Sequence, residues 1–216
     1  MTHAHGDHHD HDHPHSHPTQ ADHDDHLTYY QTMEVALREL LIKKSILSAD
    51  EVRRQVEDMD SRTPARGAQV VAHAWADPAF KARLLADGNA ALEEIGLDRG
   101  PYKLVVVENT PSVHNVIVCT LCSCYPRWLL GLPPDWYKSR NYRSRVVRGP
   151  RTVLEEFGLE LPDHVTVRVH DSTADMRYLV LPMRPSATDG WSEEQLATVV
   201  TRDTMVGVAV PRGSPP

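Results

Sequence analysis

The chain has 216 residues, of which 40% are hydrophobic and 25% are charged, with a formal net charge of −7. These values are ordinary for a soluble protein, and the acidic balance argues against nucleic acid or anionic membranes as partners. No apolar run is long enough to span a bilayer, and the polar N-terminus shows no secretory signal. The three cysteines lie together with none elsewhere to pair with, which predicts a reducing compartment and a cytoplasmic location.

The first 26 residues are rich in histidine and aspartate. Ten of the fourteen histidines lie there, interleaved with Asp as in residues 7–13. No apolar cluster is available to drive folding, so residues 1–26 are predicted to be a disordered tail. Such a tract should bind divalent transition metals weakly and reversibly. A store for incoming metal and a solvated tail without a metal role are both open.

Residues 27–100 show the spacing of apolar side chains that predicts helices. Large apolar residues are few there, so this region is expected to lack a core of its own. We predict a helical arm that packs on a partner subunit, with helices that fold back on the C-terminal domain as the alternative. The expected helices cover residues 32–44, a polar segment capped by Ser48 and Glu51, a segment from 63 through 75, residues 78–85, and a short stretch ending at 95–96.

From residue 101 the periodicity changes and predicts an α+β domain. Helices are expected over residues 141–157, with a break at Pro150 and a stop at Gly158, and from Ser192 to about residue 200. The chain is thus divided into a tail (1–26), a helical arm (27–100) and a metal-binding domain (101–216). Strands are expected at residues 102–108, 115–118, 165–170 and 177–181, with an edge strand at 205–210.

The cysteine loop, residues 119–124, contains Cys119, Cys122 and Cys124 and follows an expected strand. Because Cys122 and Cys124 are one residue apart, a metal held by both sulfurs can also bind the deprotonated backbone nitrogens of Ser123 and Cys124. Those four donors lie in a plane, and Cys119 can supply an axial sulfur. One position then remains open for water or substrate, as in catalytic metal sites. Deprotonated amides favour a small trivalent ion such as Co(III) or Fe(III) over Zn(II).

Other interpretations of the three cysteines fit less well. A redox pair would leave the third cysteine unexplained and lacks the expected βαβ context. A structural zinc site needs a fourth ligand, which His114 could supply only from within the preceding strand. Three inert buried cysteines would be a strange use of reactive residues.

This loop resembles the metal-binding motif of the nitrile hydratase α subunit. The resemblance runs from about residue 30 to about residue 211. It is carried by residues 118–126, which read Val-Cys-Thr-Leu-Cys-Ser-Cys-Tyr-Pro, and by residues 131–139, 142–148, 177–182 and 190–192.

The resemblance implies a layered α/β/β/α catalytic domain that works with β-type partner subunits and a cobalt-loading activator protein. It implies that Cys119 stays a thiolate, that Cys122 becomes a sulfinic acid, and that Cys124 becomes a sulfenic acid whose oxygen is a candidate nucleophile or base. Thr120 stands where cobalt members carry Thr and iron members Ser, so one Co(III) per subunit is implied rather than iron.

Arg127 departs from the nitrile hydratase pattern. Those enzymes usually read Tyr-Pro-Trp-Pro after the loop, whereas this chain reads Tyr125-Pro126-Arg127-Trp128. The related thiocyanate hydrolase has Arg at this position in its γ subunit, and a cation there would help to hold an anion. An Arg127 that pairs with a partner subunit is the alternative, and residues 131–134 resemble the nitrile hydratases. The substrate, nitrile or thiocyanate, therefore stays open.

Two classes of function follow. The first is a catalytic subunit that hydrates a nitrile to its amide, with Cys122, Cys124 and Arg127 as catalytic residues. The second is a non-catalytic protein that binds or delivers cobalt through the cysteine loop and the histidine-rich tail.

Overall fold

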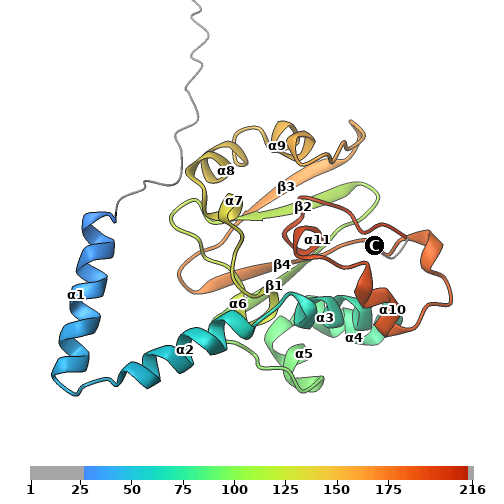
Figure 1. Ribbon diagram of the computed structural model, residues 1–216. Coiled ribbons are helices and arrows are strands. Elements are labelled where there is room, and N and C mark those ends of the chain that lie inside the picture. The colour runs from blue at the N-terminus through green and yellow to red at the C-terminus, as the bar shows by residue number, and fades with distance from the viewer. Residues whose placement is uncertain (1–26, 214–216) are drawn as a thin grey trace, which may run out of the picture.

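A computed structural model describes residues 27–213 of the chain (Figure 1). The predicted tail of residues 1–26 lies outside the described residues. The fold is α+β, as predicted, with two pairs of strands between two groups of helices. Within residues 27–213, no helix has the length and apolar character needed to cross a membrane.

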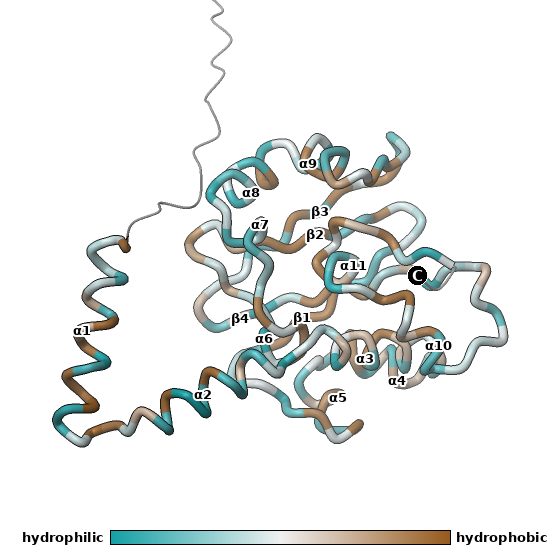
Figure 2. Tube along the Cα trace, in the orientation of Figure 1, coloured by the Kyte–Doolittle hydropathy of each residue, from teal (hydrophilic) through white to brown (hydrophobic). Residues whose placement is uncertain are grey.

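The four strands form two parallel pairs. Strand β1 (Lys103–Glu108) pairs with β4 (Met176–Leu181), and β2 (Val113–Val118) pairs with β3 (Thr166–Asp171). The alternating and apolar runs that predicted strands in these four places are confirmed. Strand β2 contacts both β4 and β1, so the two pairs lie against each other. Apolar residues recur along the strands (Figure 2). Those of β1, β2 and β4 belong to the hydrophobic core, and Val167 and Val169 of β3 pack against it.

Helices cover both outer sides of the strands and complete four layers (Figure 1). On one side, α3 packs on α10 while α4 and α5 pack on β1; on the other, α9 packs on β3 and α8 on α9. The first group comprises α3 (Ala65–Ala76), α4 (Pro78–Ala86), α5 (Gly88–Glu94) and α10 (Glu193–Thr198), and the second α7 (Asp135–Lys138), α8 (Arg140–Arg145) and α9 (Pro150–Glu156). Helix α9 begins at Pro150, which confirms the predicted break of the 141–157 segment.

Helices α1 (Tyr29–Lys43) and α2 (Ala49–Ser61) project from the layered domain (Figure 1). Neither contains a buried residue, although α1 carries several large apolar side chains. Helices α3 to α5, by contrast, contribute buried side chains to the common core. Folding back on the C-terminal domain therefore describes α3 to α5, whereas the packing of the arm on a partner subunit and the division of the chain into three domains stay predictions.

The predicted edge strand at residues 205–210 is wrong. Helix α11 (Arg202–Val206) takes up the first two residues of that stretch, because the Thr201 and Thr204 side chains form a capping box that starts a helix, and the residues after it are turn and irregular chain. The helix ends at Gly207 with φ of +93°, a left-handed conformation that favours glycine. A side chain at this position would collide with the Asn115 carbonyl group. The strand was predicted because valines alternate with other residues at positions 206, 208 and 210.

A buried polar network joins β2 to the C-terminal end of α11. The His114 ring is 4% exposed; its Nε2 donates to the Gly207 carbonyl oxygen at 2.7 Å, and its Nδ1 accepts from the Asn109 amide at 3.2 Å. Burial lowers the pKa of His114, and the hydrogen bond to Gly207 opposes that shift only in part. The folded protein therefore holds His114 neutral.

We expect the pKa of His114 to make the fold acid-sensitive. At a pH between the lowered pKa of His114 in the folded protein and its unfolded value of about 6.5, the unfolded chain binds more protons than the folded protein. The free energy of unfolding therefore decreases as the pH falls below about 6.5. His114→Gln can keep both hydrogen bonds without titrating. The drop in melting temperature between about pH 7.5 and about pH 5.5 should be smaller for this variant than for the unsubstituted protein. Equal drops in calorimetry would show that His114 makes no contribution.

Candidate metal centre

The cysteine loop leaves the core at the end of strand β2. Cys119 is buried, Cys124 is half-buried and Cys122 is exposed. The Cys119 and Cys122 sulfurs are 3.5 Å apart, the Cys122 and Cys124 sulfurs are 3.3 Å apart, and all three lie within 4.8 Å of one another. Three sulfurs on six consecutive residues thus converge on one point, which is the arrangement that a single metal ion requires.

The backbone of the loop also faces the sulfurs. The Cys122 amide donates to the Cys119 sulfur at 3.3 Å. The Cys124 thiol lowers the pKa of Cys122, and the backbone amides of Ser123 and Cys124 act in the same direction. Sequence reasoning assigned these two amide nitrogens as further ligands. That assignment stays a prediction.

Burial raises the pKa of the Cys124 thiol to about 12. Its hydrogen bond with the Cys122 sulfur adds to this rise, because the proton is shared between them. Without metal, Cys124 therefore keeps its proton near neutral pH. A thiolate at this position would therefore form together with metal binding, which displaces thiol protons. Three converging sulfurs suit a metal that accepts soft sulfur ligands, whereas a redox pair would use only two of them.

Asp171 fixes the start of the loop from the neighbouring strand. The parallel register places Asp171 at the end of β3 opposite Val118 at the end of β2. Its two carboxylate oxygens accept from the Thr120 amide at 2.9 Å and from the Thr120 hydroxyl at 2.5 Å. Sequence reasoning missed Asp171 because it lies 51 residues from Thr120 in the chain.

We expect Asp171→Asn to loosen the cysteine loop. An amide oxygen can replace one acceptor but not the charge, which should cost about 1 kcal/mol, or roughly fivefold in the retention of a bound metal. Competition with a chelator, followed by elemental analysis, would measure that loss. Asp163→Asn, a change of the same kind in the loop before β3, is the matched control. A variant at Asp171 that retains metal as well as the control does would show that this anchor is dispensable.

Two buried tyrosines hold the strand end and the far end of the loop. Tyr142 donates its hydroxyl to the Ile117 carbonyl oxygen at 2.8 Å, and Tyr137 donates to the Cys124 carbonyl oxygen at 2.9 Å. Burial raises the pKa of both hydroxyl groups, so they stay protonated donors. The loop is therefore held at both ends by groups that do not titrate near neutral pH.

Arg127 and Arg177 differ in their exposure to solvent. Arg127 begins the short helix α6 (Arg127–Leu130); its side chain is exposed and makes no hydrogen bond or ion pair among residues 27–213. Arg177 is only 5% exposed, and its positive charge opposes the burial that raises the pKa of Cys124. Arg177 lay within the motifs that carry the resemblance, but the sequence alone did not mark it as part of the site.

His114 is not a fourth ligand. Both of its ring nitrogens are engaged, with Asn109 and with Gly207. Of the His, Cys, Asp and Glu side chains in the described range, only the three cysteines form a group of three or more with metal-binding geometry. The zinc interpretation with Cys3His ligands is therefore wrong.

The α+β fold and the loop define a protein that could hold one metal ion on three sulfurs of a single turn. Known proteins identify the family more closely. The family model described as "Nitrile hydratase, alpha chain" matches residues 28–209. The cobalt-containing nitrile hydratase subunit alpha of Pseudonocardia thermophila is 53% identical over 176 residues, which are 80% of this chain and 86% of that protein.

Two further relatives widen the comparison. The thiocyanate hydrolase subunit gamma of Thiobacillus thioparus is 45% identical over 195 residues, or 85% of this chain and 80% of that one. A solved structure, a double mutant of the Fe-type nitrile hydratase from Comamonas testosteroni, has a TM-score of 0.78 at 47% identity, covering 84% of this chain and 90% of that chain. The chain belongs to the nitrile hydratase alpha-chain family and is an enzyme subunit, which confirms the resemblance.

Proposed function

We propose that this chain is the metal-bearing α subunit of a cobalt nitrile hydratase, which hydrates a nitrile to the amide. The convergence of the Cys119, Cys122 and Cys124 sulfurs carries this proposal. Cobalt is preferred over iron because of Thr120 and because the Pseudonocardia relative is named as cobalt-containing. The iron-type structure with the same fold makes iron the alternative.

The three sulfurs and the backbone nitrogens of Ser123 and Cys124 would hold the metal. When bound, Co(III) would supply Lewis-acid chemistry at one open position. By resemblance, Cys122 would carry a sulfinate and Cys124 a sulfenate. The sulfenate oxygen on Cys124 would accept a proton from the water that adds to the nitrile carbon. If it instead attacked the nitrile carbon itself, a water would have to displace it there to release the amide and restore the sulfenate. The positive charge of the buried Arg177 would partly neutralise the negative charge of these oxidised sulfurs.

A partner subunit would complete the site. Leu121, at the tip of the cysteine loop, is 86% exposed, and α1 presents exposed apolar side chains that include Tyr30 and Leu37. Large apolar groups on a projecting arm mark a surface for another protein. We therefore assign α1 and α2 to contact with a β-type subunit. A cobalt-loading activator protein and a cytoplasmic location belong to the same proposal.

Arg127 supports a second candidate, a thiocyanate hydrolase γ-type subunit. Its guanidinium is exposed and has no ion-pair partner among the described residues, so it is available to an anion or to another chain. Residues 131–134 favour nitrile hydration, and the Pseudonocardia nitrile hydratase shares more identity with this chain than the thiocyanate hydrolase does.

The deciding experiment is an assay of the co-expressed complex with a neutral nitrile and with thiocyanate. Elemental analysis of the same sample would identify the metal, and mass spectrometry of the loop peptide should find oxygen on Cys122 and Cys124 but none on Cys119. Turnover of the nitrile with about one cobalt per subunit supports the proposal. A labile divalent metal with no turnover of either substrate would favour a cobalt carrier.

Deletion of residues 1–26 should leave the turnover of a cobalt-loaded complex unchanged, because the tail offers no apolar cluster to pack. If the tail stores metal, the deletion should slow cobalt loading when cobalt is scarce. Cobalt content at limiting and at saturating supply would measure this. If the deletion variant and the full-length chain load the same amount of cobalt at limiting and at saturating supply, the tail has no role in metal storage.

A further inference from the structure

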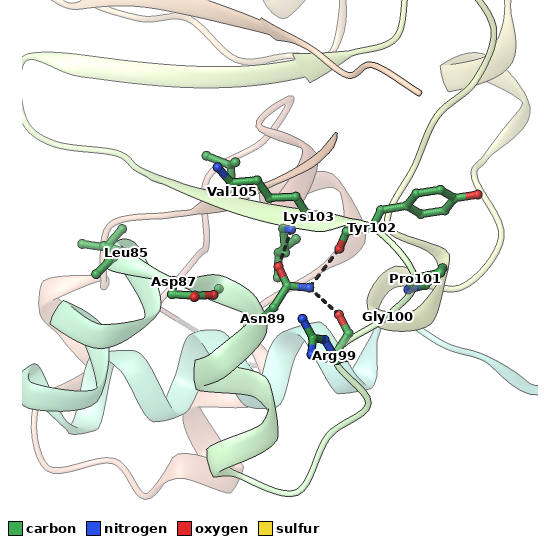
Figure 3. Close-up of a pocket in the computed structure, with 12 residues that line it drawn as sticks. Leu85, Asp87, Asn89, Arg99, Gly100, Pro101, Tyr102, Lys103 and Val105 are labelled. Atoms are coloured by element: carbon green, nitrogen blue, oxygen red, sulfur yellow. Dashed lines mark hydrogen bonds between the residues drawn. The ribbon is translucent and has the colours of Figure 1, made fainter. Parts of the chain in front are cut away.

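A single buried amide fixes the backbone turn that precedes β1. The Asn89 amide nitrogen donates to the carbonyl oxygens of Arg99 and Tyr102 at 2.7 and 2.9 Å, and its oxygen accepts from the Leu104 amide at 2.8 Å. Figure 3 shows these bonds meeting at Asn89, while the Tyr102 ring is directed away from it. The position from which the Tyr102 side chain leaves the backbone is therefore set by α5.

The Tyr102 ring lies on the guanidinium group of Arg177. The distance from the guanidinium carbon to the ring centroid is 3.9 Å, within the range of a cation–π interaction. The same ring contacts Trp128, with 6.4 Å between the centroids. Trp128 can approach because residue 100 is glycine, where any side chain would overlap the indole. Arg177 is thus covered by an aromatic face and withdrawn from solvent, which strengthens the attraction.

Arg177 in turn braces the turn that follows Asp171. Its Nη1 donates to the carbonyl oxygens of Thr173 at 2.5 Å and of Met176 at 3.0 Å. The Ser172 amide at the start of this turn donates to the Val118 carbonyl oxygen at 2.8 Å, directly before the cysteine loop. The Arg177 Nε is buried and has no acceptor among the described residues. The guanidinium is therefore held by its Nη1 bonds and by the Tyr102 ring.

We propose that Tyr102 is a positioning residue for the metal centre: its ring holds the Arg177 guanidinium against the turn after Asp171, and this turn is bonded to Val118 directly before the cysteine loop. Tyr102 itself touches none of the three sulfur ligands. Its catalytic consequence rests on the proposed function, but its effect on Arg177 does not. Removing the aromatic face should free the guanidinium to move toward water and loosen the turn.

The test compares Tyr102→Leu with Tyr102→Phe in the cobalt-loaded complex. Phe keeps the aromatic face and should stay within about twofold of the unsubstituted rate. Leu removes it and should lower kcat roughly five- to thirtyfold, which corresponds to a desolvated cation–π interaction, with KM nearly unchanged. Trp191→Leu is the control, since Trp191 is a partly buried aromatic residue before α10 that has no ring contact among the described residues. This control should leave kcat unchanged.

Two readouts do not depend on turnover. In Tyr102→Leu, the sulfur-to-cobalt absorption band should shift at unchanged cobalt content, and hydrogen exchange of the amides in residues 172–176 should speed up; Tyr102→Phe should restore both. A Tyr102→Leu variant with the unsubstituted spectrum and exchange rates would overturn the proposal, as would a Phe variant as impaired as the Leu variant. If the unsubstituted complex turns over neither substrate, the proposed function fails, while the spectrum and exchange still test Tyr102.

Discussion

Replacing Cys119, Cys122 or Cys124 by serine is expected to abolish cobalt retention and turnover. Each residue is assigned one sulfur ligand, and a serine hydroxyl is a much poorer ligand for this metal because it does not ionise near neutral pH. Loss of groups that only orient ligands already costs about 10–100-fold in metal affinity or activity, so loss of a ligand should exceed about a hundredfold. Elemental analysis and rate measurement on the purified complexes would give both quantities.

Ser123→Ala is the matched control for these three variants. It changes a side chain inside the same loop but leaves the backbone nitrogen that is assigned to the metal, so cobalt content should remain near that of the unsubstituted complex. Circular dichroism and gel filtration would show that each cysteine variant still folds and assembles. A cysteine variant with full cobalt and full rate would refute the assignment of the loop.

Arg127→Trp is expected to shift the substrate preference toward neutral nitriles over thiocyanate by roughly tenfold or more. If Arg127 faces the open side of the cysteine loop, it would give an anionic substrate a charge-assisted hydrogen bond of about 1.5–3 kcal/mol. Because 1.4 kcal/mol corresponds to about tenfold, the ratio of the two kcat/KM values is the quantity to measure.

Two companion variants separate charge from shape at this position. Arg127→Gln removes the charge without adding an indole ring and should shift the ratio in the same direction. Arg148→Gln, in the exposed turn between α8 and α9, should leave it unchanged. If Arg127 contacts a partner chain instead, its replacement should weaken assembly and lower both rates alike. An unchanged ratio with intact assembly would show that Arg127 determines neither property.

The local signals in the sequence predicted much of the fold. Ser48 with Glu51 and Ser192 with Gln195 are capping boxes that the structure forms as expected. Pro150 begins a helix as its ring geometry favours. The strand predicted at residues 205–210 was wrong. Alternating valines predict a strand there, but the nearby Thr201 and Thr204 side chains start a helix. Local hydrogen bonds prevailed over periodicity there.

The site was only partly predictable, for a physical reason. Cys119, Cys122 and Cys124 are neighbours in the chain, so spacing alone showed that their sulfurs could meet. Asp171 reaches Thr120 only because β2 and β3 pair in parallel, and Tyr102 reaches Arg177 only because β1 and β4 do. Parallel partners are joined by long connections, which no local pattern reveals.

The bond between Thr120 and Asp171 also bears on when the site can form during biosynthesis. All three cysteines are synthesised well before Asp171, which follows Thr120 by 51 residues. A growing chain that ends between them carries every sulfur but neither strand β3 nor its carboxylate, and closing that long loop has an entropic cost that only strand pairing offsets. Metal captured earlier would sit in an unsupported peptide. The order of synthesis therefore makes a durable site, if the loop binds metal as proposed, a property of the nearly finished chain.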